Sequence, residues 1–238
     1  MLKKDYTKLY QLQDKFLNFW QTIKTPFYLT GGTALGRFYL EHRYSEDLDF
    51  FVNNDDDYKK HINTIYQAIS KVFSFDVENN LFYDDFTRLF ITDNNISVKL
   101  EFVNDIPYRT DITNSIFFGK IDTPINILSN KLSALINRDE PKDIFDIIHI
   151  SLNYNFNWSK IFIEVKHKEI INEIAVEQKI NSFPVALFDN VDWFIKKPDN
   201  AIFSGYIKQI SDDFITGSDN SICKTNVRIE DAKIKLSF

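Results

Sequence analysis

The chain has 238 residues, enough for one large domain or two modest ones, and its 44% apolar and 26% charged residues are typical of a folded protein. A formal net charge of −6 argues against a general nucleic-acid coating protein, which would be basic, but it allows a local basic groove. The single cysteine excludes an intramolecular disulfide framework. Because there is no signal-peptide core and no apolar run of membrane-spanning length, we expect a cytoplasmic protein without a membrane partner.

The first half of the chain predicts a mixture of helices and strands. Apolar side chains at spacings of three and four predict an amphipathic helix over 5–22, and further helices are expected over 33–41 and 58–73. The predicted strands are 27–29, 48–52, 73–77, 88–92, 97–103 and 115–121. A hairpin turn is expected at 93–95.

From Pro124 onward the pattern is helical throughout. The predicted helices are 125–137, 142–152, 158–178, 183–196 and 200–215, separated by breaks rich in Asn, Pro and Asp. We therefore predict an α+β protein in which residues 1–122 form a domain with a mixed sheet and residues 123–238 form a helical bundle domain.

The strongest functional pattern lies between residues 27 and 51. Gly31 and Gly32 follow a short apolar strand, and paired glycines let a backbone approach a bulky group with its N–H groups turned toward it. Asp47 and Asp49 alternate with apolar residues, so in a strand they share one face, where they repel each other unless a cation lies between them. The alternative is two solvent-facing residues of an edge strand, although strands generally avoid Asp. We favour a site for Mg²⁺ or Mn²⁺ and a metal-dependent phosphoryl or nucleotidyl transfer.

A third carboxylate is expected in a two-metal site, and Glu101 in the predicted strand 97–103 is the best candidate. The competing interpretation is that Glu101 and Lys99 form an exposed pair on a half-buried strand. Asp93 and Asp105 are weaker candidates because both are expected in loops.

A second group of charged residues lies on the predicted helices after Pro124. Lys131 and Arg138 share one helix face, and Asp143 and Asp146 lie one turn apart on the next helix. In a functional interpretation Lys131 neutralises a triphosphate, while Asp143 or Asp146 orients Lys131, Arg138 or the acceptor. Periodicity alone favours an ordinary amphipathic helix, with Asp143 stabilising its N-terminus.

Together these motifs resemble the AbiEii/AbiGii toxin family over about residues 25 to 150. The matching segments are Gly31-Gly32-Thr33-Ala34-Leu35, His42-Arg43-x-Ser45-x-Asp47-Leu48-Asp49-Phe50-Phe51, Lys131 to Arg138, and Lys142-Asp143-Ile144-Phe145-Asp146. The resemblance implies a polymerase-β-like nucleotidyltransferase domain followed by a helical bundle.

The resemblance also implies roles for individual residues. The nucleotide would be contacted by Gly31, Gly32, Thr33, Arg43, Ser45 and Arg138. The metals would be held by Asp47 and Asp49, while Lys131 matches the helix lysine of the family and Asp143 its later acidic motif. No motif places the third carboxylate, Glu101.

The resulting prediction is an enzyme that moves a nucleoside monophosphate from a nucleoside triphosphate to an acceptor hydroxyl and releases pyrophosphate. The resemblance implies the toxin half of a toxin–antitoxin or phage-defence pair, with a cognate antitoxin and with the 3′ end of a tRNA or a protein as acceptor. The alternative is a catalytically silent nucleotide-sensing or partner-binding module of the same fold. A metal-dependent phosphohydrolase is disfavoured because its histidine cluster is missing: His42, His61, His149 and His167 are scattered along the chain.

Overall fold

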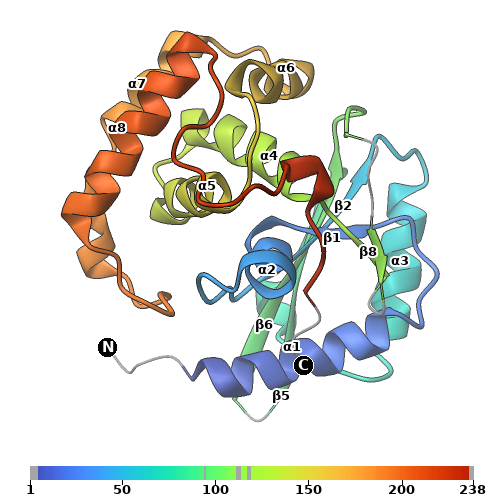
Figure 1. Cartoon of the computed structure of the whole chain (residues 1–238). Helices are drawn as coiled ribbons and strands as arrows, with labels where there is room; N and C mark the ends of the chain where they lie inside the picture. Colours follow the sequence, from blue (N-terminus) through green and yellow to red (C-terminus); the bar gives the residue numbers. More distant parts are fainter. Residues whose placement is uncertain (1–4, 94, 111–113, 117–118, 236–238) are drawn as a thin grey trace. The chain divides into compact units, whose positions relative to one another are not determined.

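The computed structural model describes residues 5–93, 95–110, 114–116 and 119–235 (Figure 1). The chain divides into two compact units, of which the first comprises Met1–Ala34 and Ser45–Asp122 and the second Leu35–Tyr44 and Thr123–Phe238. The segment Leu35–Tyr44 lies within the predicted first domain but makes its contacts in the second unit. In the described part of the chain, no helix is both long enough and apolar enough to cross a bilayer.

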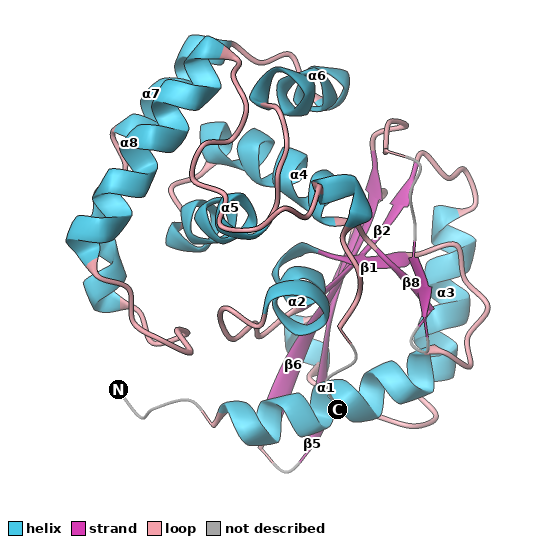
Figure 2. Ribbon diagram, in the orientation of Figure 1, coloured by secondary structure: helices cyan, strands magenta, loops and turns pink. Residues whose placement is uncertain are grey.

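The strands of the first unit form one mixed sheet, shown in magenta in Figure 2. They are β1 (Tyr28–Thr30), β2 (Leu48–Asn53), β3 (Ser74–Phe75), β4 (Leu81–Phe82), β5 (Phe86–Asp93), β6 (Ile96–Asp105), β7 (Asn114–Ile116) and β8 (Gly119–Ile121). Neighbours follow the order β3-β5-β6-β2-β1-β8-β7, and β4 also pairs with β5. The β2–β6 and β1–β8 pairs are parallel and the others antiparallel. This order places β2 between β1 and β6.

One face of this sheet is covered by aromatic packing from helices. The helices of the first unit are α1 (Tyr6–Trp20), α2 (Gly31–Leu35, whose last residue belongs to the second unit), α3 (Tyr58–Ile69) and the 3₁₀ turn η2 (Val77–Asn79). The ring of Trp20 in α1 lies 4.3 Å from that of Phe50 in β2 and 5.7 Å from that of Phe102 in β6. From α3, the Tyr58 hydroxyl donates to the Phe102 carbonyl over 2.9 Å. Because side chains alternate along a strand, the polar residues of β2 and β6 lie on the opposite face.

The second unit is built from helices that pack around an aromatic core. They are η1 (Gly36–Leu40, a π-helix), α4 (Pro124–Asn137), α5 (Pro141–Asn153), α6 (Trp158–Lys168), α7 (Glu173–Asn181), η3 (Val185–Asn190), α8 (Asn200–Thr216) and η4 (Ile229–Asp231). Helix α4 contacts α5, α6 and α7, and α7 lies along α8 (Figure 1). The ring of Phe145 in α5 packs against Trp193 and Phe203, at 5.1 and 5.6 Å between ring centroids.

The predicted α+β class is confirmed, with a mixed sheet followed by a helical C-terminal region. The predicted helix 183–196 is wrong beyond the short turn η3. The backbone after that turn extends, because Phe194 forms a β-bridge with Arg43 and the Trp193 carbonyl accepts a hydrogen bond from the backbone N–H of Tyr44. The rings of Trp193 and Phe194 pack against Phe145 in the aromatic core instead of along one helix face.

Two other predicted elements are divided in the structure. The predicted helix 158–178 is interrupted between α6 and α7, where the side chain of Asn172 accepts a hydrogen bond from the Ile174 N–H and caps α7. The predicted strand 115–121 is the hairpin of β7 and β8, and residues 117–118 lie outside the described part of the chain.

Candidate functional site

The central strands of the first unit bring three carboxylates to one face of the sheet. Along β2 the buried side chains of Leu48 and Phe50 alternate with half-buried Asp49, and Asp47 directly precedes the strand. The parallel register between β2 and β6 pairs Asp49 with Glu101. Asp47, Asp49 and Glu101 therefore lie on the face opposite the aromatic core.

The glycine turn lies directly against one of these carboxylates. Gly31 has φ = +68°, which L side chains rarely adopt, and a Cβ atom on it would lie 2.5 Å from Oδ2 of Asp49. The hydroxyl of Thr33 donates a hydrogen bond to the backbone carbonyl of Asp47. The turn is thus held to the backbone of Asp47 through Thr33, and Gly31 is the residue that leaves room for Asp49.

Two cations partner the carboxylates of this face. Nζ of Lys99 lies 3.0 Å from Oδ2 of Asp47 and 3.2 Å from Oε1 of Glu101. Arg88 in β5 places Nη2 2.7 Å from the same oxygen of Glu101. Burial alone would lower the pKa of Lys99, but the two carboxylates raise it above its usual value. Lys99 is therefore a charged residue of the candidate site.

The donor set on this face fits a divalent ion that arrives with a nucleotide. In the described part of the chain, no three acidic, histidine or cysteine side chains are grouped so that they would hold a metal jointly. Mg²⁺, however, is commonly bound by one or two carboxylates while substrate phosphates and water complete its shell. Asp47 and Asp49 supply that pair beside a residue without a side chain. The role of Glu101 as a third carboxylate stays a prediction, since its partners here are Lys99 and Arg88.

A buried charge network occupies the second unit. Asp146 in α5 is fully buried, and both of its carboxylate oxygens accept hydrogen bonds from Arg43, over 2.6 Å from Nε and 2.7 Å from Nη2. The same carboxylate lies 2.8 Å from Nε2 of His42 and 2.9 Å from Nζ of Lys131. Because the guanidinium of Arg43 forms this buried ion pair with Asp146, Arg43 could contact a phosphate only if the pair were broken.

The same network holds the other charged residues predicted from the helices. Nζ of Lys131 lies 2.7 Å from Oδ1 of Asp143, and Arg138 donates to both oxygens of that carboxylate, over 2.8 and 3.0 Å. Asp143 therefore contacts Lys131 and Arg138, while Asp146 contacts Lys131 and Arg43. Both predicted acids are engaged, each with a different pair of cations.

The pKa values in the network follow from burial and from these pairs. Burial alone would raise the pKa of Asp146, but Arg43 and Lys131 hold it well below its usual range. The pKa of Asp143 is likewise lowered against the effect of burial by Lys131 and Arg138. Burial lowers the pKa of His42, so its imidazole is neutral and Nε2 donates to the ionised Asp146. Among the five charged side chains, three cations thus face two carboxylates.

Ser45, which the resemblance places near the phosphates, is buried in the first unit. Its backbone N–H donates to the hydroxyl of Tyr10, and its carbonyl accepts from the side chain of Gln13, over 3.1 and 3.0 Å. The polar atoms of its main chain thus tie the segment before Asp47 to α1. A contact between its hydroxyl and a nucleotide stays a prediction.

Sequence reasoning missed one buried acid at the edge of β8. Asp122 is fully buried, and it accepts hydrogen bonds from the Thr30 hydroxyl over 2.6 Å and from Nη2 of Arg109 over 3.0 Å. Thr30 lies beside Gly31 and pairs with Asp49 in the β1–β2 register. A carboxylate directly after the predicted strand 115–121 is the signal that would have suggested a role at this edge of the sheet.

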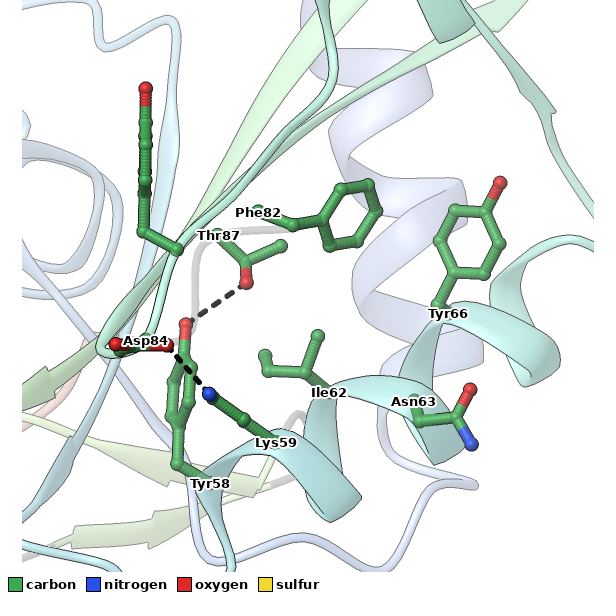
Figure 3. A pocket seen from close by; sticks show the side chains of 9 residues that line it. Tyr58, Lys59, Ile62, Asn63, Tyr66, Phe82, Asp84 and Thr87 are labelled. Atoms are coloured by element: carbon green, nitrogen blue, oxygen red, sulfur yellow. Dashed lines mark hydrogen bonds and ion pairs between the residues drawn. The ribbon is translucent and has the colours of Figure 1, made fainter.

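A cavity of about 360 Å³ also lies in the first unit, between α3 and the β4–β5 connection (Figure 3). Its rim carries the exposed ion pair of Lys59 and Asp84, and its wall carries Tyr66 and Phe82. None of the residues that line it belongs to the glycine turn or the carboxylate face. We therefore place the candidate site on the carboxylate face.

Comparison with known proteins shows the family and the fold of the chain. The family model described as "Nucleotidyl transferase AbiEii toxin, Type IV TA system" matches residues 19–185, more than half of the chain. No curated protein sequence matches. The solved structure of JHP933 from Helicobacter pylori is 19% identical, with a TM-score of 0.56 over 91% of this chain and 96% of that chain. MenT4, a nucleotidyltransferase toxin from Mycobacterium tuberculosis H37Rv, is 15% identical, with a TM-score of 0.49 over 89% of this chain and 84% of that chain.

The likeness to JHP933 shows a shared fold at low identity. The family match includes the glycine turn, Asp47, Asp49 and the residues of the buried charge network. The chain therefore belongs to the AbiEii family of nucleotidyl transferase toxins of type IV toxin–antitoxin systems, and it is a nucleotidyltransferase.

Proposed function

We propose that this enzyme transfers a nucleoside monophosphate from a nucleoside triphosphate to an acceptor hydroxyl, with Mg²⁺ or Mn²⁺ held by Asp47 and Asp49. The observation that carries the proposal is the carboxylate of Asp49 against the side-chain-free Gly31, with Asp47 on the same face of the sheet. The bound ion would neutralise charge on the phosphates and make the α-phosphorus a better electrophile.

The residues of the chain have distinct tasks in this proposal. Gly31 and Gly32 would offer backbone N–H groups to the phosphates, and Thr33 keeps the backbone of Asp47 in position through its hydrogen bond. In the second unit, contacts of Lys131 and Arg138 with a nucleotide stay predictions from the resemblance. Arg138 is the more exposed of the two, with 54% of its side chain accessible.

For the acceptor, we propose the 3′ end of an RNA such as tRNA, with a protein hydroxyl as the second candidate. Membership in a type IV toxin–antitoxin family supports a toxic role and a cognate antitoxin that opposes it. Gel separation distinguishes the two acceptors, because label on RNA is removed by ribonuclease and label on protein is removed by protease.

The test is a transfer assay with each α-³²P-labelled nucleoside triphosphate, Mg²⁺, and either total RNA or cell protein. Asp49→Asn keeps the size of the side chain and removes its charge, so we expect transfer to fall by about 100-fold or more. Asp93→Asn is the matched control, because Asp93 lies in the β5–β6 hairpin and pairs with Lys15, and it should retain full activity. Transfer that is insensitive to both Asp49→Asn and a chelator would refute the proposed site.

The same assay tests the alternative of a catalytically silent module. Such a protein would bind a nucleoside triphosphate without transferring label to either acceptor. Its toxicity on expression would then be the same for the parent chain and for Asp49→Asn. The family match to nucleotidyl transferase toxins speaks against this alternative.

A further inference from the structure

The ammonium group of Lys99 lies between two carboxylates, and one of them, Asp47, is a proposed metal ligand. Its Nζ lies 3.0 Å from Asp47 and 3.2 Å from Glu101, so one ammonium group bridges the two acids across β2 and β6. Glu101 has a second cationic partner in Arg88, at 2.7 Å. For Asp47, Lys99 is the cation that the described structure places on its carboxylate.

The charges of this face show what Lys99 does to a metal ion. Asp47, Asp49 and Glu101 contribute three negative charges, and Lys99 and Arg88 contribute two positive ones. These five groups sum to one negative charge, and a divalent ion that arrives alone meets an ammonium group on one of its two ligands. Binding of this ion is weakened because the Asp47–Lys99 pair is lost and because the ammonium group of Lys99 repels the divalent ion.

A metal–nucleotide complex interacts with Lys99 differently from a metal ion alone. Its phosphates are anionic, so they offer the ammonium of Lys99 a new partner when the metal takes the Asp47 carboxylate. The lysine side chain has four rotatable carbons, and a quarter of it is exposed, so its charged end can move without a change in the backbone. The ammonium group of Lys99 would then exchange the Asp47 carboxylate for a phosphate, so it has an anionic partner both before and after binding.

We propose that Lys99 occupies the Asp47 carboxylate in the nucleotide-free enzyme and passes to the phosphates when metal and nucleotide bind together, so that metal binding depends on nucleotide. The proposal rests on the proposed function, since it assumes that Asp47 and Asp49 hold the metal. It adds a residue and a binding order: Lys99 disfavours the metal alone and favours the metal–nucleotide complex.

Two binding measurements test the proposal without any catalytic turnover. The first titrates Mn²⁺ into nucleotide-free protein and measures free Mn²⁺ by electron paramagnetic resonance. The second measures, by calorimetry in excess Mn²⁺, the binding of each of the four α,β-methylene nucleoside triphosphates, which cannot transfer a nucleotide. For Lys99→Met we expect Mn²⁺ alone to bind about tenfold more tightly and the nucleotide about tenfold more weakly.

The opposite signs of these two changes separate the proposal from a structural role. A lysine that only stabilises the sheet would change neither affinity in a correctly folded variant, or would weaken both through a disturbed site. Lys99→Arg keeps the cation and should leave the binding of Mn²⁺ alone as weak as in the parent chain. Lys59→Met is the matched control, because it removes an exposed lysine paired with Asp84 in the same unit and should change neither affinity.

The outcomes also separate this inference from the proposed function. If Mn²⁺ binds the parent chain equally well with and without nucleotide, and Lys99→Met changes neither affinity, the metal site stands and the role of Lys99 is refuted. If Mn²⁺ binds neither protein under either condition, both proposals fail. Lys99→Gln keeps a hydrogen-bonding group on Asp47 without the charge. It must give the same opposite changes should Lys99→Met fail to fold.

Discussion

Substitution of Gly31 by alanine tests the close approach that defines the candidate site. Gly31 has φ = +68°, and an alanine held in this left-handed region costs roughly 1–2 kcal/mol of stability. Its Cβ would also lie 2.5 Å from Oδ2 of Asp49, whereas ordinary contact begins near 3.4 Å, so the carboxylate must move by about 0.9 Å. Because a displacement of about 1 Å at a catalytic group costs up to about 100-fold in rate, we expect transfer to fall by 10- to 100-fold.

Alanine substitutions at two other glycines provide controls for this experiment. Gly217 ends α8 with φ = +64°, and a Cβ there would contact Ser159, so Gly217→Ala carries a similar backbone strain in the second unit. Gly205 lies within α8 with no atom near the position of a Cβ, so Gly205→Ala should stabilise the helix by about 0.8–1 kcal/mol. Thermal unfolding and the transfer rate are measured for all three variants.

The comparison of Gly31→Ala with Gly217→Ala decides the outcome. Both should unfold at a lower temperature than the parent chain, but Gly31→Ala alone should lose activity when each is assayed well below its own unfolding temperature. Equal activity in the two variants would refute the claim that the room left by Gly31 positions Asp49 for catalysis.

Buried ionisable side chains of the second unit yield two further predictions. Asp146→Asn removes the shared partner of Arg43 and Lys131, so we expect a loss of about 3–5 kcal/mol in chemical unfolding, against at most about 1 kcal/mol for the exposed pair removed by Asp139→Asn. A loss below 1 kcal/mol for Asp146→Asn would show that the network is not structural. The second concerns His149, whose pKa burial lowers to about 3. The unfolded chain takes up this proton near pH 6.5 while the folded chain does not, so stability falls as pH decreases through that value, by about 1.4 kcal/mol between pH 7.5 and 5.5. His149→Asn should reduce that slope in unfolding curves measured across this range, and an unchanged slope would contradict the assignment.

Local periodicity explains which parts of the fold were predictable from the sequence. The alternation of Leu48, Asp49 and Phe50 predicts both the strand and the face on which Asp49 lies, and β2 has that pattern of burial. Helices α4 and α5 begin within one residue of their predicted starts, because Pro124 and Pro141 occupy first-turn positions. The predicted helix 183–196 failed where a distant contact overrides local pattern: the backbone of Trp193 and Phe194 pairs with residues 43 and 44.

Sequence pattern could not predict the partners of the charged residues, because these partners are distant in the sequence. Asp146 is 103 residues from Arg43. Asp47 directly precedes β2 and Lys99 lies in β6, and no short motif reports the parallel pairing of these two strands. The segment that contains Arg43 identifies the family, yet its guanidinium and the carboxylate of Asp146 satisfy each other inside the protein. Asp49, in the same motif, lies half-buried against a glycine on the face of the sheet opposite the aromatic core. We infer that the family motif combines residues proposed to contact a ligand with residues that hold the fold, and that burial together with ionic partners separates the two. By this criterion, substitutions of Asp47, Asp49 and Lys99 should change ligand binding most and stability least. A substitution of Gly31 should also change ligand binding, but it adds backbone strain that lowers stability.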